Sequence, residues 1–432
     1  MQYSVIDFIY ERFLKKHRII FSALVIISTC VLMMLKAEPL FQMDSESLVS
    51  VPMLAEVNDK EFDNSQYGLG SFFAEVGETF YYNYFKENDI EMNRHEYTYG
   101  PYISQFGLQG YFCCFIARFI KSSGTVGVMR AVFCLLTVFL TFLIAAGIKK
   151  RYGLLPAVCS WIVLIYSHWV YDFAPNLYWA MFTWLVPIML GLMCVNHEDK
   201  RKLIYPLFFI AMVVKCLCGY EYISTIMLSG EVFLIAEWLV KKEKRRKLTY
   251  CIIISGLCML MGFIAVMLFQ SYRYGEGDLI KGFKFFKYYL VERRTFGNYA
   301  EYEPVYADSL NASVWAVLKK YFWSLPDGKK ITMLLAAGVL SVLIQKVFFR
   351  KDVRIKATFV VIQLISALSW IVLAKSHSFI HVHINFIVFY IGFAQVCVYC
   401  AADAVLSHIR VCVENDGNDM SNKSKIRFSL VK

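Results

Sequence analysis

Long apolar runs dominate this chain and restrict what it can fold into. Of its 432 residues, 58% are hydrophobic and 18% are charged, whereas a soluble domain is about half apolar and a quarter charged. Many runs approach the roughly 20 residues with which a helix crosses bilayer hydrocarbon. Runs of this length exclude a transmembrane β-barrel, whose strands are about ten residues long and alternate in polarity. The sequence predicts an all-α polytopic membrane protein.

We predict about ten membrane-spanning helices, with both ends of the chain on the cytoplasmic side. The first span follows a basic amphipathic segment, residues 1–18, and lacks a signal-peptide cleavage pattern, so it should remain as an anchor. The predicted spans are residues 19–35, 127–148, 153–170, 177–195, 203–219, 222–240, 250–270, 331–349, 357–374 and 383–403. They define a core, 19–270, that includes an outer loop, 36–126; a second outer loop, 271–330; C-terminal helices, 331–403; and a cytoplasmic tail, 404–432.

Basic residues gather in five clusters, and each cluster borders an apolar run. Positive charge beside such runs stays on the cytoplasmic side. All five clusters share a side only if the apolar stretch 102–120 does not cross the membrane, so we predict an outer juxtamembrane helix there. The clusters are residues 15–18, 149–151, 200–202, 241–247 and 350–356. Orientation and anionic lipid headgroups account for the net charge of +11, and no nucleic-acid partner is expected.

The same topology places the acidic, aromatic and histidine-rich segments outside, where we expect the function. The outer loop 36–126 is acidic and rich in aromatic residues, which favours packed or interfacial helices over disorder. Asp44-Ser45-Glu46 follows the first span. These two carboxylates could share a divalent metal, or one could act as a base; the alternative is that they complement the dipole at a helix N-terminus.

Three ionisable positions lie at or within the apolar runs. Asp172 follows the third span among aromatic residues, where a carboxylate is costly unless it faces a polar cavity; the alternative is an acid that caps the next helix. Lys215 and Glu221 flank the outer end of the fifth span, and we expect them to pair with each other. Glu231 lies near the middle of the sixth span and needs a partner inside the bundle.

The densest polar cluster is the segment 374–385, which lies between two spans on the outer side. Its three histidines have spacings that zinc accepts, but Lys375 disfavours a cation and favours an anion, so we predict hydrogen-bond donors to a phosphate. The alternative is that the segment belongs to a belt of residues at the membrane interface, but such belts use Trp and Tyr rather than clustered histidines. Arg293 and Arg294 in the second outer loop could contact an anionic headgroup, although a lipid-surface role is the simpler interpretation.

In the order and spacing of its motifs, the chain resembles the GT-C superfamily of polyprenyl-phosphate-sugar-dependent glycosyltransferases. That superfamily includes protein O-mannosyltransferases and lipid A aminoarabinose transferases. The matching motifs are Asp44-Ser45-Glu46, Gly100-Pro101-Tyr102, Met129-Arg130-Ala131, Lys149-Lys150-Arg151-Tyr152-Gly153 and Tyr171-Asp172-Phe173. The family's usual Asp-Glu pair is Asp-Ser-Glu here, which leaves open whether Asp44 or Glu46 is the base.

The resemblance implies transfer of a sugar from a polyprenyl-phosphate carrier to a glycan, lipid or protein acceptor, with inversion at the anomeric carbon. The catalytic candidates are Asp44, Glu46 and Asp172, where Asp172 orients the acceptor or helps to hold a metal. Lys375, His377, His381, His383 and Arg130 would bind the donor phosphate. Candidate substrate-binding residues are Arg94, His95, Tyr97, Asn176, Glu221 and Arg293. No cofactor is required, although the carboxylates would accept a divalent metal.

Two other functions fit the same sequence features. A surface-polysaccharide polymerase or ligase would also use a lipid-linked donor, and it would depend more on outer-loop arginines such as Arg293. A flippase or transporter without bond chemistry would show inverted repeats and broken helices near the midplane, and the sequence shows no repeat. The composition indicates a bacterial cytoplasmic membrane, with the site on its extracytoplasmic face.

Overall fold

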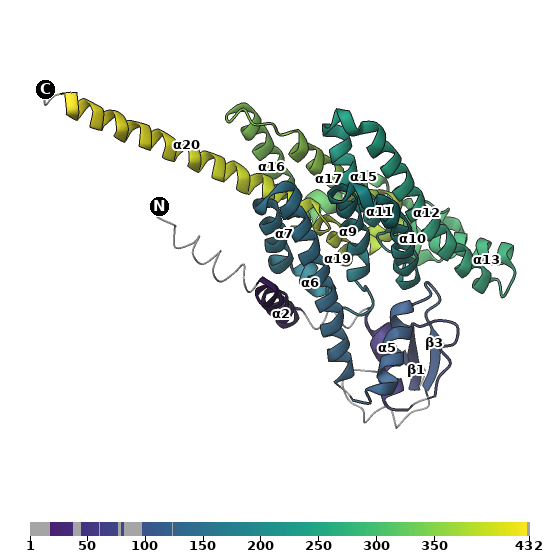
Figure 1. Cartoon of the computed structure of the whole chain (residues 1–432). Helices are drawn as coiled ribbons and strands as arrows, with labels where there is room; N and C mark the ends of the chain where they lie inside the picture. The colour runs from purple at the N-terminus through teal and green to yellow at the C-terminus, as the bar shows by residue number, and fades with distance from the viewer. Residues whose placement is uncertain are drawn as a thin grey trace.

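A computed structural model of the chain describes residues 18–37, 45–59, 61–76, 79–81, 97–122 and 124–429, with the backbone alone for 73–81, 97 and 412–429. Long apolar helices form most of it (Figure 1). Among the described residues, six helices are long and apolar enough to cross a membrane: α2 (Arg18–Lys36), α6 (Thr125–Tyr152), α11 (Ile223–Val240), α12 (Arg245–Tyr274), α16 (Pro326–Val347) and α17 (Arg354–Leu373). The chain is therefore a mostly helical membrane protein.

The structure does not confirm ten crossings. The apolar stretch 153–170 is divided at Ser167 into α7 (Leu154–Tyr166) and α8 (His168–Phe173). The helix α9 (Phe182–Asn196) has 15 residues, a length of about 22 Å against the roughly 30 Å of bilayer hydrocarbon. The helix α10 (Arg201–Cys218) carries three basic residues. A seventh crossing is available if Val382–Tyr390 and Phe393–Val411, which meet at a bend of 49°, form one span.

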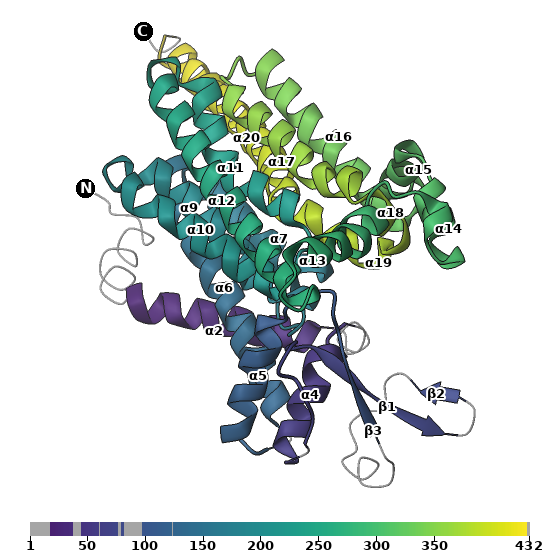
Figure 2. The ribbon, with the colours of Figure 1, turned by 90° about the vertical axis from the view of Figure 1, so that its right-hand side faces the viewer.

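The helix α11 lies at the centre of the bundle and packs against α9, α12 and α17. Glycines bring α9 and α11 into backbone contact, since a Cβ added at Gly191 would lie 1.9 Å from the carbonyl oxygen of Gly230. Small residues serve this purpose in membrane bundles because they let helix backbones approach closely. On one flank, α16 and α17 pack against α20 (Phe393–Ser429), and these helices run side by side in Figure 2.

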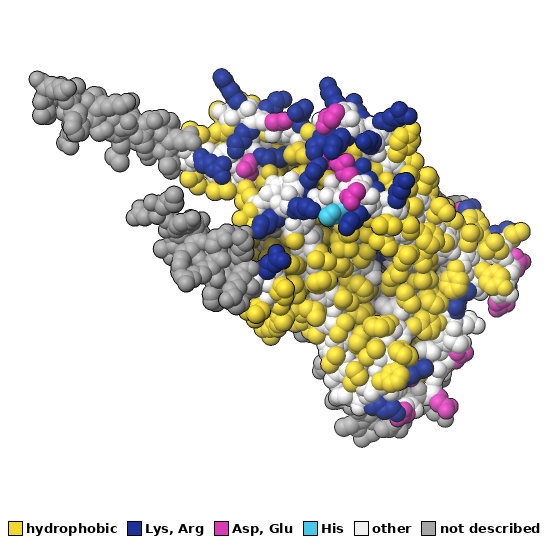
Figure 3. Space-filling view, in the orientation of Figure 1, with side chains coloured by type: hydrophobic (Ala, Val, Ile, Leu, Met, Phe, Trp, Pro, Cys, Tyr) yellow, Lys and Arg dark blue, Asp and Glu magenta, His cyan; other side chains and the backbone are white. Residues whose placement is uncertain are grey.

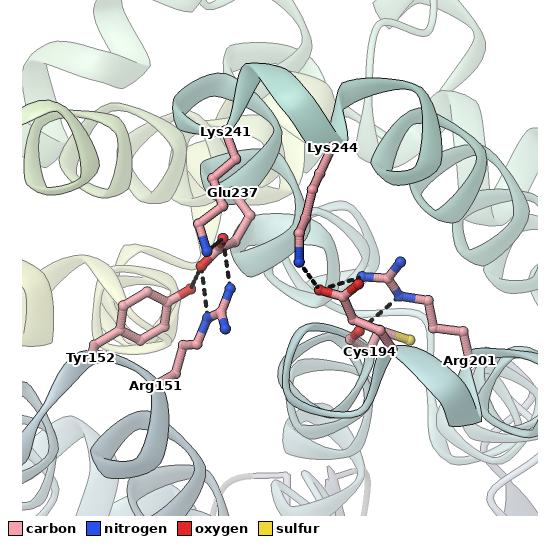
Figure 4. A network of polar contacts seen from close by, with 8 residues as sticks. Arg151, Tyr152, Cys194, Arg201, Glu237, Lys241 and Lys244 are labelled. Atoms are coloured by element: carbon pink, nitrogen blue, oxygen red, sulfur yellow. Dashed lines mark hydrogen bonds and ion pairs between the residues drawn. The ribbon is translucent and has the colours of Figure 1, made fainter.

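Basic residues gather at one end of the bundle, as the sequence predicts (Figure 3). Arg151 and Lys241 both form ion pairs with Glu237, at 2.8 and 2.7 Å. Lys244 and Arg201 approach Glu198 at 2.7 and 4.0 Å (Figure 4). Residues of three predicted clusters thus meet around Glu237 and Glu198. We call the end of the bundle that carries them the basic end. That the basic end faces the cytoplasm stays a prediction.

A small extramembrane unit lies at the opposite end (Figures 1 and 2). It contains α4 (Ser47–Val57), α5 (Leu108–Phe119) and a three-stranded antiparallel sheet in the order β2-β1-β3. The strands are β1 (Gly70–Val76), β2 (Thr79–Tyr81) and β3 (Tyr97–Pro101), with Gly70 opposite Pro101 in the register. The helices predicted for this loop are present as α4 and α5, but the sequence did not predict the sheet. Phe62, Phe72 and Tyr99 pack together, and aromatic side chains fit such a half-buried sheet.

The ambiguous apolar stretch 102–120 forms the 12-residue helix α5, which is too short to cross a bilayer. Gly107 precedes it in the left-handed conformation, with φ of 79°. One face of α5 packs on α4, while Phe112, Phe115 and Phe119 are exposed. These features agree with the predicted juxtamembrane helix.

The second loop, 271–330, folds into short helices at the same end as the sheet and packs against α18 (Lys375–Ile380). These elements are α13 (Leu279–Phe286), η4 (Lys287–Val291), η5 (Glu292–Arg294), η6 (Tyr299–Glu301), η7 (Pro304–Tyr306), α14 (Ala307–Asn311), α15 (Val314–Lys319) and η8 (Lys320–Ser324). The remaining elements of the described residues are η2 (Glu198–Lys200), η3 (Lys242–Lys244), α19 (Val382–Asn385) and η9 (Phe386–Tyr390).

Candidate functional site

A polar cavity of about 460 Å³ lies at the end opposite the basic end, which we call the cavity end. Segments far apart in the sequence form its wall. The extramembrane unit contributes Ser45 and residues 101–104, the second loop contributes Arg293, Arg294 and Tyr306, and α18 with the residues after it contributes two histidines. The complete lining is Ser45, Pro101, Tyr102, Ile103, Ser104, Tyr178, Trp179, Glu221, Arg293, Arg294, Tyr306, Ser376, His377, Ile380, His381 and Ile384.

A buried ion pair forms part of the cavity wall. Arg294 donates to Glu221 over 3.2 Å, and both side chains are almost fully buried. Burial is the largest influence and opposes the charged guanidinium, but Glu221, Tyr102 and Tyr178 together outweigh it and raise the pKa of Arg294. The predicted pairing of Glu221 with Lys215 is wrong: the Lys215 ammonium donates to the carbonyl of Gly219 over 2.6 Å. Glu221 therefore lines the cavity, and its charge is neutralised by Arg294.

Arg293 provides the cation available to a ligand. Its guanidinium lies 5.1 Å from the Tyr306 ring centroid and 5.9 Å from that of Tyr289. No carboxylate in the described part of the chain lies within ion-pair distance of it. Stacking on aromatic faces suits arginine and holds its planar fork in place. An anion in the cavity would thus find an oriented cation whose charge is not already compensated by a described acid.

Two of the predicted histidines lie side by side in this cavity. The rings of His377 and His381 are 4.5 Å apart. Burial, together with the positive charge of Arg294, holds the pKa of His377 well below its usual range, so the imidazole is neutral at pH 7. The buried Nδ1 of His377 has no hydrogen-bond partner among the described residues. His377 therefore has a ring nitrogen that could hydrogen-bond a ligand without adding charge, and its predicted binding of a phosphate stays a prediction. His383 lies 5.7 Å from His381, ring to ring, but is not part of the lining.

Two predicted phosphate-binding cations serve other contacts. The buried Lys375 donates to the carbonyl of Leu310 over 2.6 Å and joins α18 to α14. Arg130 forms an ion pair with Glu46 at 2.7 Å. Neither Lys375 nor Arg130 is among the residues that line the cavity. The structure thus places both cations outside the cavity wall, each engaged by a nearby acceptor, and their phosphate-binding role stays a prediction.

Glu46 is fully buried, and both of its carboxylate oxygens are engaged. Arg130 donates to Oε2, and the backbone N–H of Leu177 donates to Oε1 over 2.8 Å. These contacts fix the start of α4 against α6 and engage both oxygens of Glu46 away from the cavity lining. Asp44 lies outside the described residues, but its neighbour Ser45 lines the cavity.

The remaining predicted site residues fall outside the cavity lining or outside the described residues. Asp172 is buried in α8 and does not line the cavity. The side chain of Asn176 is fully buried, and its Oδ1 accepts from the backbone N–H groups of Tyr178 and Trp179, so it holds a turn. Arg94 and His95 lie outside the described residues, and Tyr97 is described by its backbone only, in β3.

Sequence reasoning missed the aromatic wall of the cavity and the partner of Glu221. Tyr102, Tyr178 and Tyr306 come from three separate segments, and none carries a motif that distinguishes it from the chain's other 25 tyrosines. The adjacent arginines in the second loop were the one available signal for Arg294. Glu231 is buried in α11 beside the hydroxyl of Ser255 in α12.

A second, apolar cavity of about 190 Å³ lies within the bundle, between α6 and α7 on one side and α17 and α20 on the other. Ile144, Leu164, Leu185 and Phe359 are among the residues that line it, and Gly392 at the bend before α20 also contributes. Within the described residues, no three His, Cys, Asp or Glu side chains are placed to hold a metal ion.

The fold and the site define an integral membrane protein of mostly helical structure with a polar cavity at one end, lined by arginine and histidine. Comparisons with protein-family models, with curated proteins and with solved structures found no match to this chain.

Proposed function

We propose that this protein is a membrane glycosyltransferase that takes a sugar from a polyprenyl-phosphate carrier and transfers it to an acceptor at the cavity end. One observation carries the proposal. Arg293, Arg294, His377 and His381 converge on one polar cavity at the end of a membrane bundle, directly beside Ser45 of the acidic motif. Arginine and histidine at such a position suit a phosphate that is attached to a membrane lipid.

The chemistry follows from these positions. An acceptor hydroxyl attacks the anomeric carbon of the sugar, and the bond from that carbon to the phosphate oxygen breaks. The lipid phosphate leaves with a second negative charge, which Arg293 and a hydrogen bond from His377 stabilise as it develops. A carboxylate takes the proton of the hydroxyl, and of the two motif acids Asp44 is our candidate because the oxygens of Glu46 are engaged.

The carrier's lipid tail would lie among the spanning helices. Its apolar surface belongs in hydrocarbon or in an apolar cavity, and the cavity between α6, α7, α17 and α20 is a candidate for part of it.

The direct test is transfer of a radiolabelled sugar from a polyprenyl-phosphate donor by purified Asp44→Asn protein. Loss of a general base lowers the rate by about 10²- to 10⁴-fold, and we expect an effect in that range. Asp63→Asn is the matched control, since Asp63 is an acid of the same extramembrane unit that does not line the cavity. Full transfer by Asp44→Asn would remove Asp44 from the mechanism.

A surface-polysaccharide polymerase or ligase is the second candidate function, and the position of Arg293 in the cavity favours it. Such an enzyme would depend on the arginines more than on the acidic motif. If Arg293→Gln abolishes transfer and Asp44→Asn does not, this second candidate replaces the first.

Transport without bond chemistry is favoured by one feature, the 49° bend between Val382–Tyr390 and Phe393–Val411. Broken helices are common where transporters bind their substrates. Detergent-solubilised protein separates the two functions, because a transferase forms product in a single phase and a transporter cannot act without two compartments.

A further inference from the structure

The helix α13 presents an apolar stripe away from the protein. One side is buried against the end of α12, where a Cβ added at Gly282 would lie 1.6 Å from the carbonyl oxygen of Ser271. The other side carries Leu279, Ile280 and Phe283, of which 43, 72 and 43% is exposed. Asp278 caps the helix by accepting from the backbone N–H groups of residues 280 and 281. The exposed stripe is thus built on a well-defined helix.

Lysines lie beside this apolar stripe. Lys284 and Lys287 are four residues after Ile280 and Phe283, so each lies next to the stripe on the helix surface. Lys287 also lies 2.9 Å from Glu292, while Lys284 has no ion-pair partner in the described part of the chain. An apolar stripe with flanking lysines is typical of helices that lie in the surface of a membrane.

The stripe continues the lipid-facing surface of a spanning helix. The last turns of α12 expose Leu268, Phe269 and Tyr272, and α13 packs against that end of α12. In Figure 3 the hydrophobic surface of the bundle extends to α13 at the right of the view. Because α12 crosses the membrane, α13 lies where the hydrocarbon meets the headgroups.

We propose that α13 is an interfacial anchor whose partner is the lipid surface at the cavity end. Its apolar stripe enters the hydrocarbon boundary, and its lysines contact anionic headgroups. This role goes beyond the proposed function. The helix continues through η4 directly into η5, which carries Arg293 and Arg294. The anchor therefore holds the two cavity arginines at the level of the headgroups.

Site-directed fluorescence tests this proposal. Full-length Ile280→Cys protein carries an environment-sensitive dye and is reconstituted in vesicles that contain lipid with a spin label near the headgroup. We expect quenching at least about threefold stronger than for a dye at Glu303→Cys, an exposed position of the same loop. Equal quenching at both positions would overturn the proposal. So would a dye signal that follows protein concentration and not lipid, which would indicate a second copy of the chain as the partner.

The charge component has its own test. Dye quenching at position 280 should be stronger in vesicles with an anionic lipid than in neutral vesicles. The variant Lys281→Gln/Lys284→Gln/Lys287→Gln should lose this difference. The control Lys329→Gln/Lys330→Gln, which removes exposed lysines of the same loop away from α13, should retain it. If the triple variant still distinguishes the two vesicles, the lysines do not contact anionic headgroups.

Discussion

At the scale of single residues, the cavity depends on an unequal pair of neighbours in the sequence. Arg294 is neutralised by Glu221, whereas Arg293 stacks on tyrosines and has no acidic partner among the described residues. The binding of a negatively charged ligand should therefore depend mainly on Arg293. This distinction was not visible in the sequence, because Glu221 and Arg294 are 73 positions apart and only the fold brings them together.

We predict that Arg293→Gln weakens binding of a polyprenyl phosphate about 10- to 100-fold, since a hydrogen bond to a charged group contributes about 1.5–3 kcal/mol. Arg293→Lys should retain part of the affinity, because it keeps the charge but not the planar fork. Equilibrium binding to purified protein measures both effects. Lys330→Gln, an exposed lysine of the same loop, is the control, and an equal loss in that variant would contradict a specific site.

The contributions of Glu221 and Arg294 to the free energy of unfolding should be coupled. Arg294→Met leaves the buried Glu221 without its partner, at an expected cost of about 3–5 kcal/mol. The double variant Glu221→Leu/Arg294→Met should recover most of this loss, because it removes both buried charges. Thermal unfolding in detergent gives the comparison. A double variant no more stable than Arg294→Met would show that the pair is not coupled.

The lowered pKa of His377 predicts that the stability of the folded protein depends on pH. Its pKa is lowered in the folded protein, so the unfolded chain binds the proton first as the pH falls through about 6.5. The folded state therefore loses stability below that pH, at up to about 1.4 kcal/mol per pH unit. Unfolding between pH 7.5 and 5.5 should show a steeper loss for the natural protein than for His377→Gln. Identical slopes would mean that His377 accepts a proton in the folded state.

At the scale of elements, the length of the apolar runs predicted where most helices lie. It predicted less well which of these helices are long enough to cross the membrane. The predicted span at 127–148 lies within α6, and the span at 357–374 matches α17 to within one residue at its end. The span predicted at 153–170 is divided at Ser167, because an apolar run does not encode where its backbone turns. The strands β1 and β3 were missed since their pairing joins residues on either side of a long intervening segment.

Glu231 gives a prediction at this scale, since it is a carboxyl buried in the middle of α11 and outside the polar cavity. A buried carboxyl inside a membrane bundle costs free energy, so Glu231→Leu should leave thermal stability unchanged or raise it. Sugar transfer should persist. A stable Glu231→Leu protein that has lost its activity would assign the carboxyl a direct function and favour transport.

At the scale of the whole molecule, the sorting of basic residues was the most informative sequence feature. Three predicted clusters meet around Glu237 and Glu198 at one end, and Glu221, His377 and His381 line a cavity at the other. Charge sorting succeeds because it depends on local sequence beside each apolar run. It could not select which polar residues share the cavity: Lys375 and Arg130 are at the correct end, but both are already engaged.

The central claim is that the cavity lies on the side opposite the basic end and binds a lipid-linked phosphate. Labelling of single cysteines with a membrane-impermeant thiol reagent tests both parts together. In intact cells, Ser45→Cys should react and Lys150→Cys should not, and added polyprenyl phosphate should protect Ser45→Cys in purified protein. Labelling of both positions from the same side, or an unprotected Ser45→Cys at saturating lipid, would contradict the account.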